Sequence, residues 1–236
     1  MNKSVLMASL TLSLLSGSAL AMEQVVLDGK HLTQDQAWAI ADGAKVKIAP
    51  QAKTQLVKAH ELLMEAARLG KPVYGLTVGV GLNKDHKLFD ANGKLSDAVL
   101  DASRSFNFST FRAHSAGVGE AAPIRLTRLA LAVRLNTMLA GQTGVQPVVA
   151  ELYEAYLNKG LTPVIPAKGT VGEADILLSS HVGLAMVGEW EVFYKGQRVS
   201  SKEAMADAGI TPLVPMGKDA LSILSNNAFA VAYAMQ

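Results

Sequence analysis

A tyrosine within a glycine-rich segment is the side chain whose setting most favours chemistry. Tyr74 lies in residues 73–81, VYGLTVGVG, which contain three glycines. Glycines at this density predict a loop whose backbone bends sharply or approaches another group closely. A tyrosine on such a loop suits a binding or catalytic site, and the plain alternative is a ring packed within the loop. Because tyrosine is protonated at neutral pH, a role as base requires a neighbouring cation or surroundings that favour the phenolate.

Other common site chemistries have little support in the sequence. The chain contains no cysteine, which excludes disulfides, thiolate nucleophiles and cysteine metal ligands. Its five histidines form no HExxH motif and no pair at i, i+4 spacing, which argues against a metal site. Gly79-Val80-Gly81 lacks the third glycine of a dinucleotide fingerprint and opens no helix, so nucleotide binding is not predicted.

Helices are expected to position these side chains. Of the 236 residues, 50% are hydrophobic and only 6% are aromatic, with alanine and leucine dominant, which favours packed helices over sheets. Thr33 and Gln36 form a capping box at the start of one helix. Proline and glycine predict further helices over 50–70, 123–139 and 147–159.

The predicted helix over residues 123–139 is apolar on nearly every side, so it should be buried in a bundle or a subunit interface. We expect its apolar surface to lack partners within this chain. Residues 190–199 predict one β-hairpin, and Ser200 with Glu203 predicts a second capping box. A last helix is predicted over 219–234. The chain stops inside this apolar run without a stop signal, which is typical of a truncated sequence.

The N-terminus has the pattern of a secretory signal peptide. Lys3 precedes an apolar stretch over 5–15, and Ala19-Leu20-Ala21 matches an A-x-A cleavage site. The stretch is shorter than the roughly 20 residues that a membrane-spanning helix needs. The sequence therefore predicts cleavage of residues 1–21, a mature domain over 22–236, and a periplasmic or secreted location.

Charge gives no sign of a polyanionic partner. The chain has 22 basic and 20 acidic residues, a formal net charge of +2. Neither nucleic acid nor a membrane surface is predicted as a partner.

Three segments in order resemble the histidine and aromatic amino acid ammonia-lyase family. Residues 73–81 resemble its YG-x-x-T/V-G-F-G loop, and residues 114–120, HSAGVGE, resemble its SHAAGVG segment. Residues 163–189, from PVIP through GTVG to VGE, are similar to its P-V-V-P…GSVG-ASG-D…GEGEV segment. The resemblance covers about residues 27–228 and matches the N-terminal half of the family.

This resemblance implies a mainly α fold, an elongated helical bundle of the aspartase/ammonia-lyase type with a small β-hairpin. It also implies a homotetramer whose active sites are built from several subunits. Tyr74 matches the family tyrosine that acts as a base or positions the substrate at its β-carbon. His114 matches an active-site histidine, although a helix-surface or core histidine is the plain alternative.

The chain departs from the family where the family builds its electrophile. Relatives cyclise Ala-Ser-Gly into a methylideneimidazolone, whereas residues 172–175 read Gly-Glu-Ala-Asp, one residue shorter and without the serine and following glycine. We therefore expect no such cofactor. Glu173 and Asp175 are candidate substrate-binding carboxylates in its place. The alternative is that they stabilise a helix N-terminus.

A second departure concerns residues 221–227, where the family has L-x-L-x-N-G-T. Ser225 takes the place of the family asparagine, and Asn226 lies beside it. Both are candidate substrate-binding residues, and the sequence leaves open which of them faces the site.

The function expected from this resemblance is carbon–nitrogen lysis of a histidine-like or aromatic amino acid without the electrophile, as in the ergothionase type. A primary ammonium is then a poor leaving group, whereas the trimethylammonium of a betaine is a good one. The alternative is a non-catalytic small-molecule-binding relative or an inactive remnant.

Overall fold

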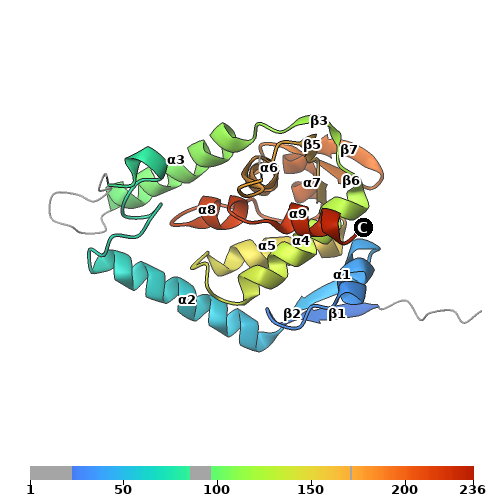
Figure 1. Cartoon of the computed structure of the whole chain (residues 1–236), viewed down its shortest axis with the longest axis horizontal. Helices are drawn as coiled ribbons and strands as arrows, with labels where there is room; N and C mark the ends of the chain where they lie inside the picture. The colour runs from blue at the N-terminus through green and yellow to red at the C-terminus, as the bar shows by residue number, and fades with distance from the viewer. Residues whose placement is uncertain (1–22, 86–96, 171) are drawn as a thin grey trace, which may run out of the picture.

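The computed structural model describes residues 23–85, 97–170 and 172–236. The predicted signal peptide over 1–21 lies outside these ranges. The described chain is mainly helical, as predicted, with several short strands at the periphery (Figure 1).

Helix α4 is the centre of the fold. It runs over Ile124–Leu139, and helices α1 (Gln34–Ala41), α5 (Pro147–Lys159) and α9 (Ala228–Ala234) pack around it. Leu126, Leu129, Leu135 and Met138 are fully buried. The expectation that this helix lacks partners was wrong, because other helices of the same chain cover its apolar surface.

A buried arginine on α4 ties three helices together. The Arg128 guanidinium donates to the carbonyls of Ile40 (2.8 Å) and Ala41 (3.0 Å) at the end of α1. It also donates to the carbonyl of Leu157 in the last turn of α5 (3.2 Å). The last carbonyls of a helix lack intrahelical partners, so Arg128 satisfies both helix ends at once.

Two long helices frame this core on opposite sides in Figure 1. Helix α2 covers Pro50–Arg68, followed by a 3-10 turn over Gly81–Asn83, and helix α3 covers Asp97–His114. Pro50 occupies the first turn of α2, and Gly70 follows its end with a φ of 69°. This is the predicted proline-in, glycine-out pattern.

A parallel pair of strands closes one end of the molecule. Strand β1 (Gln24–Leu27) pairs with β2 (Lys45–Ile48), and helix α1 connects the two strands along the chain. The capping box predicted at Thr33, at the start of α1, is confirmed. Helix α5 covers the outer edge of β2: Asn158 Oδ1 accepts from Val46 N (2.7 Å), and Glu154 Oε1 accepts from Ile48 N (2.8 Å). The sequence did not predict this pair.

The predicted hairpin is confirmed as β6 (Glu191–Tyr194) and β7 (Gln197–Ser200). Lys195 and Gly196 both have positive φ, 50° and 76°, which the mirror-image two-residue turn requires. Strand β4 (Thr162–Pro163) extends this sheet, while β3 (Val118–Ala121) pairs with β5 (Pro166–Lys168).

The second predicted capping box does not form. Ser200 precedes helix α7 (Ser201–Asp207), but its side chain makes no capping hydrogen bond. Ser200 is still paired in β7, opposite Glu191. The neighbouring Ser201 hydroxyl instead accepts from the Trp190 amide (3.2 Å), which fastens the helix start to the sheet.

The predicted last helix is broken in two. Helix α8 covers Asp219–Leu224 and α9 begins at Ala228, with residues 225–227 between them. The side chain of Asn226 bonds to the backbone at Ile223 O (2.8 Å) and Ala228 N (2.8 Å). Asparagine competes with helical hydrogen bonding in this way, and here it interrupts the helix.

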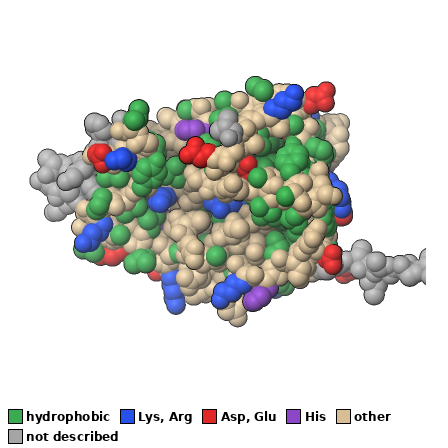
Figure 2. Space-filling model, viewed as in Figure 1, with side chains coloured by type: hydrophobic (Ala, Val, Ile, Leu, Met, Phe, Trp, Pro, Cys, Tyr) green, Lys and Arg blue, Asp and Glu red, His purple; other side chains and the backbone are tan. Residues whose placement is uncertain are grey.

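Charge and helix hydropathy can be followed on the described part of the chain. Basic and acidic side chains are intermixed over the face in Figure 2. Within the described ranges, none of the helices combines the length and apolar character needed to cross a membrane.

Candidate active site

The loop carrying Tyr74 is held from within by a buried threonine. The Thr77 hydroxyl accepts from Val73 N (2.6 Å) and donates to Lys71 O (2.6 Å). Gly75 N donates to Val78 O (3.0 Å), closing a tight turn next to Tyr74. The loop therefore has a defined shape within this chain.

The Tyr74 side chain is 47% exposed, so it is not a ring packed under the loop. Its hydroxyl oxygen accepts a hydrogen bond from Gly81 N at 2.8 Å. The oxygen thus combines access for a ligand with a fixed N–H donor.

Gly75 brings this loop against helix α8. It has a φ of 73°, and a Cβ built on it would lie 2.1 Å from Leu221 Cδ1. Only glycine combines this backbone conformation with so close an approach. The glycine next to Tyr74 thereby sets how the loop lies on α8.

His114 is the last residue of α3. Its Nδ1 lies 2.8 Å from Thr110 O, and because a carbonyl only accepts, Nδ1 carries the proton. The ring is half-buried, and its Nε2 makes no hydrogen bond within the described residues. In the neutral ring, Nε2 is left as an acceptor for another group.

The segment after His114 packs on the third motif. A Cβ at Gly117 would lie 3.1 Å from Pro166 Cβ and 3.2 Å from His181 Nε2. Strand β3, which follows, pairs with β5. Two of the three motifs found in the sequence are therefore neighbours in space.

Residues 172–175, where relatives build the electrophile, form an exposed turn that ends in a buried aspartate. Gly172 has a φ of 88°, and its N–H donates to Thr170 Oγ1 (3.2 Å). Glu173 is exposed and makes no hydrogen bond or ion pair within the described ranges. Its carboxylate is therefore available to a ligand.

Asp175 has a different environment. It is 1% exposed, and its Oδ2 accepts from Ala230 N in the first turn of α9 (2.9 Å). Its own N–H donates to Asn226 O (2.7 Å). A carboxylate at a helix N-terminus satisfies an otherwise free N–H, so these contacts fit the stabilising alternative.

The structure separates the two residues that the sequence left undecided. Asn226 is half-buried, and its Nδ2 donates to Ser179 Oγ (3.1 Å) on helix α6 (Ile176–Met186) as well as to Ile223 O. Ser225 is exposed, and no hydrogen bond within the described chain uses its hydroxyl. Ser225 is thus the one whose side chain is free to meet a ligand.

Helices α3, α6 and α8 bring these segments together, as Figure 1 shows. On α3, Asn107 donates to Gly217 O (3.0 Å) and accepts from Ala220 N (2.7 Å) at the start of α8. The Tyr74 loop contacts α8 through Gly75, and the residues around Asp175 contact the end of α8. No hydrogen bond within the described ranges joins Tyr74 directly to His114.

His181 is a residue to which the sequence analysis gave no role. It is 1% exposed, its ring centroid lies 4.5 Å from that of Trp190, and neither ring nitrogen has a partner among the described residues. Burial lowers the pKa of His181 to about 4, so the ring is neutral at physiological pH. It lies within the third motif, residues 163–189, and only the structure shows that it underlies Gly117.

The fold and the site define a class of protein: a mainly α bundle in which a glycine-rich loop carries an exposed tyrosine and the end of a long helix carries a half-buried histidine. No cluster of three or more histidine, aspartate or glutamate side chains in the described ranges could hold a metal. The aromatic amino acid lyase family model matches residues 32–236. The chain belongs to this family.

Individual relatives agree with this assignment. The chain is 32% identical over 212 residues to a histidine ammonia-lyase of Treponema denticola, covering 89% of this chain and 38% of that protein. It is 30% identical over 205 residues to one of Bacillus cereus, covering 85% and 38%. The chain thus spans about two fifths of the length of these relatives.

Solved structures show the same fold. An ergothioneine-degrading ergothionase from Treponema denticola, in complex with desmethyl-ergothioneine sulfonic acid, matches with a TM-score of 0.83 at 37% identity, over 90% of this chain and 41% of that one. Histidine ammonia-lyase from Trypanosoma cruzi matches with a TM-score of 0.78 at 25% identity, over 90% and 40%.

Proposed function

We propose that this protein is a carbon–nitrogen lyase that eliminates an amine from a histidine-like or aromatic amino acid without a methylideneimidazolone electrophile. The observation that carries the proposal is the segment over 172–175. Ring formation in the family needs a serine hydroxyl that leaves and a glycine nitrogen that attacks, and Glu173 and Ala174 offer neither. These residues do not fit the cofactor, and the proposed elimination does not use it.

Without the electrophile, the substrate must itself carry a group that leaves readily. A primary ammonium departs poorly without covalent activation, whereas a quaternary trimethylammonium leaves as a neutral amine. The similarity to the ergothioneine-degrading ergothionase supports a substrate with a trimethylammonium group. We therefore assign a betaine of a histidine-like amino acid as the substrate class.

Tyr74 is the proposed base. Its phenolate oxygen takes the proton from the β-carbon, and the C–H electrons form the new carbon–carbon double bond. The C–N bond breaks, and the amine leaves with that electron pair. The exposed position of Tyr74 and the N–H donor at Gly81 support this role.

The other predicted site residues divide into two groups. His114, Glu173 and Ser225 have side-chain atoms free for a substrate, and an exposed carboxylate such as Glu173 suits a cationic ammonium. The side chains of Asp175 and Asn226 are hydrogen-bonded within the fold. We assign these two a positioning role, since they hold the 172–175 segment against α9 and α8.

Location and assembly belong to the same proposal. The Ala19-Leu20-Ala21 site supports export and a mature protein that begins at Met22. Family membership supports a homo-oligomer, with a tetramer as the family state. Mass spectrometry of periplasmic material that showed an intact Met1 terminus would refute the export proposal.

Product analysis tests the reaction. The assembled protein is incubated with L-histidine, L-phenylalanine, ergothioneine and the trimethylammonium betaine of histidine, and released ammonia and trimethylamine are measured separately. Trimethylamine from a betaine, with no ammonia from the two primary amines, is the expected result. Ammonia from histidine at a comparable rate would contradict the proposal.

A tyrosine substitution tests the base. Tyr74→Phe keeps the ring and removes the hydroxyl, and the loss of a general base lowers kcat by about 10²–10⁴-fold. Tyr233→Phe, on the exposed side of α9, is the matched control and leaves kcat unchanged. A Tyr74→Phe protein with the kcat of wild type would exclude Tyr74 as the base.

A further inference from the structure

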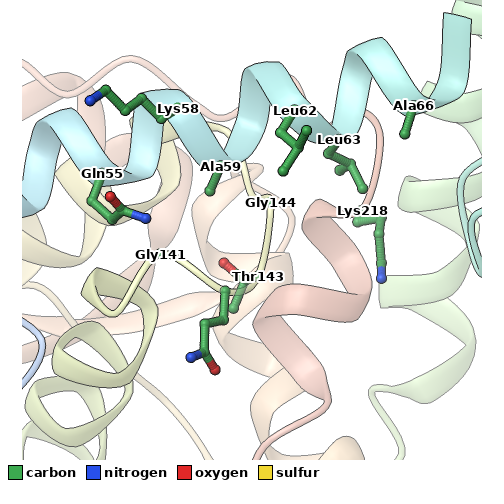
Figure 3. A pocket seen from close by; sticks show the side chains of 11 residues that line it. Gln55, Lys58, Ala59, Leu62, Leu63, Ala66, Gly141, Thr143, Gly144 and Lys218 are labelled. Carbon is green, nitrogen blue, oxygen red and sulfur yellow. The ribbon is translucent and has the colours of Figure 1, made fainter.

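A cavity lies between helix α2 and the loop over residues 141–144. Its volume is about 560 Å³, within the range of about 300–1,000 Å³ that is common for small-molecule sites. Figure 3 shows α2 along one side of it and Lys218 at the start of α8 on another. The residues that line it do not include Tyr74, His114, Glu173 or Ser225.

One wall of the cavity is apolar. Ala59, Leu62, Leu63 and Ala66 follow the i, i+3, i+4, i+7 spacing that places side chains on one face of a helix. Leu62 is 73% exposed, so nothing in the described chain covers this face there. The wall suits the apolar body of a ligand.

The opposite wall is held in place. Gly141 and Gly144 have positive φ, and a Cβ on Gly144 would lie 2.8 Å from Leu63 Cδ2. His60 Nδ1 donates to Gly144 O at 3.0 Å, which joins the loop to α2. The cavity is therefore preformed, which lowers the entropic cost of binding.

Beyond residue 144, the same loop is anchored to α8. The buried carboxylate of Asp219 accepts from Gln146 N (2.9 Å) and Gln146 Nε2 (2.5 Å). It also accepts from Met216 N (3.0 Å). Asp219 thus faces Gln146 and Met216, and its negative charge is engaged there.

Lys218 places a positive charge in this cavity. It is half-buried, and no hydrogen bond or ion pair within the described ranges uses its ammonium group. The lining contains a second lysine, Lys58, and no carboxylate. Burial lowers the pKa of Lys218, so a negatively charged partner would stabilise its protonated form.

We propose that this cavity binds a small organic carboxylate whose apolar body lies on α2 and whose carboxylate pairs with Lys218. A charged group beside an apolar wall distinguishes such a ligand from an inorganic anion, which would leave the wall uncovered. Gln55, Gln142 and Thr143 supply amide and hydroxyl groups for its remaining polar atoms. The site is separate from the proposed catalytic residues, so its test does not depend on turnover.

Isothermal titration calorimetry of the full chain tests the proposal, with benzoate as the probe. Benzyl alcohol and benzylamine have the same ring without the negative charge, and inorganic phosphate has the charge without the ring. Benzoate is expected to bind, and each of the other three at least about tenfold more weakly, since hydrogen bonds to charged groups are the stronger ones. Equal binding of benzyl alcohol or of phosphate would overturn the proposal.

Two variants locate the site. Lys218→Met keeps an unbranched side chain one atom shorter and removes the charge, so benzoate affinity falls at least about tenfold. Lys47→Met, on an exposed lysine of β2, is the matched control and leaves affinity unchanged. Ala59→Phe fills the cavity without touching the lysine, and it also weakens benzoate binding about tenfold or more. Wild-type benzoate affinity in either folded cavity variant would refute the site.

Discussion

Two regions of this chain are stabilised in different ways. Around α4, buried leucines from one helix pack against three others, and Leu129 is completely inaccessible to solvent. In the motif segments, the loops are held by single side chains that bond to backbone groups, such as Thr77 within the Tyr74 loop and Asn226 between α8 and α9. The first region is specified by many equivalent contacts, and the second by a few particular ones.

The residues that stabilise the core around α4 therefore differ from the residues of the motif segments that are proposed to meet a substrate. Apolar packing tolerates change where volume is kept, whereas a hydrogen-bonded loop depends on the identity of individual residues. The exposed candidate site residues Tyr74, Glu173 and Ser225 lie in the second region. Three substitutions test the contrast.

The largest effect is expected in the α4 core. Leu129→Ala removes a fully buried side chain and lowers the free energy of unfolding by about 2–5 kcal/mol. Ile124→Ala on the same helix, at a position 45% exposed, costs less than about 1 kcal/mol. Urea denaturation of both variants measures the difference. Equal losses would show that α4 is not the centre of the folded core.

The next effect is a pH dependence at the junction of two motifs. The pKa of His181 is lowered to about 4 in the fold, below the value of about 6.5 in the unfolded chain. The unfolded state therefore binds more protons between these values, and stability rises with pH from about 4 to 6.5, by at most about 3 kcal/mol.

Denaturation midpoints measured across this pH window test the assignment. His181→Gln removes the titrating ring, so the stability of the variant depends less on pH between about 4 and 6.5 than that of wild type. The same slope in both proteins would mean that His181 is not the buried titrating group.

The smallest effect is expected at the break between α8 and α9. Asn226→Ala removes bonds to Ser179, Ile223 and Ala228 and lowers the free energy of unfolding by about 1–3 kcal/mol. Asn227→Ala is the matched control, because Asn227 is exposed and its side chain makes no capping bond. Its cost stays within about 0.5 kcal/mol. Thermal unfolding that ranked the two variants equally would contradict the role of Asn226.

Local signals in the sequence predicted much of the fold. Pro50 and Gly70 marked α2, Pro147 and Gly160 marked α5, and the Lys195-Gly196 turn marked the hairpin. The parallel pair of β1 and β2 escaped prediction because each strand has only four residues and its edge is satisfied by α5, far along the chain. The capping box predicted at Ser200 was wrong. Ser200 is the last residue of β7, where it pairs with Glu191, and its side chain makes no capping hydrogen bond.

The candidate site could be predicted only in part. The motif resemblance selected Tyr74, whose exposed hydroxyl accepts one hydrogen bond from Gly81 N. It also selected His114 and Ser225, of which Nε2 and the hydroxyl make no hydrogen bond within the described chain. It also selected Asp175, but spacing along the chain does not show that a carboxylate meets the N-terminus of α9. The cavity at Lys218 has no sequence motif, because α2, the 141–144 loop and α8 meet there only in the folded protein.

We propose that residues 172–175 remain ordinary peptide and that elimination proceeds without an electrophile made from them. Intact-mass measurement of the assembled protein, followed by peptide mapping, tests this claim most directly. The peptide holding Glu173 is expected to have the mass of its unmodified sequence. A loss of two waters mapped to that peptide would contradict this expectation, because it would show that the ring had formed.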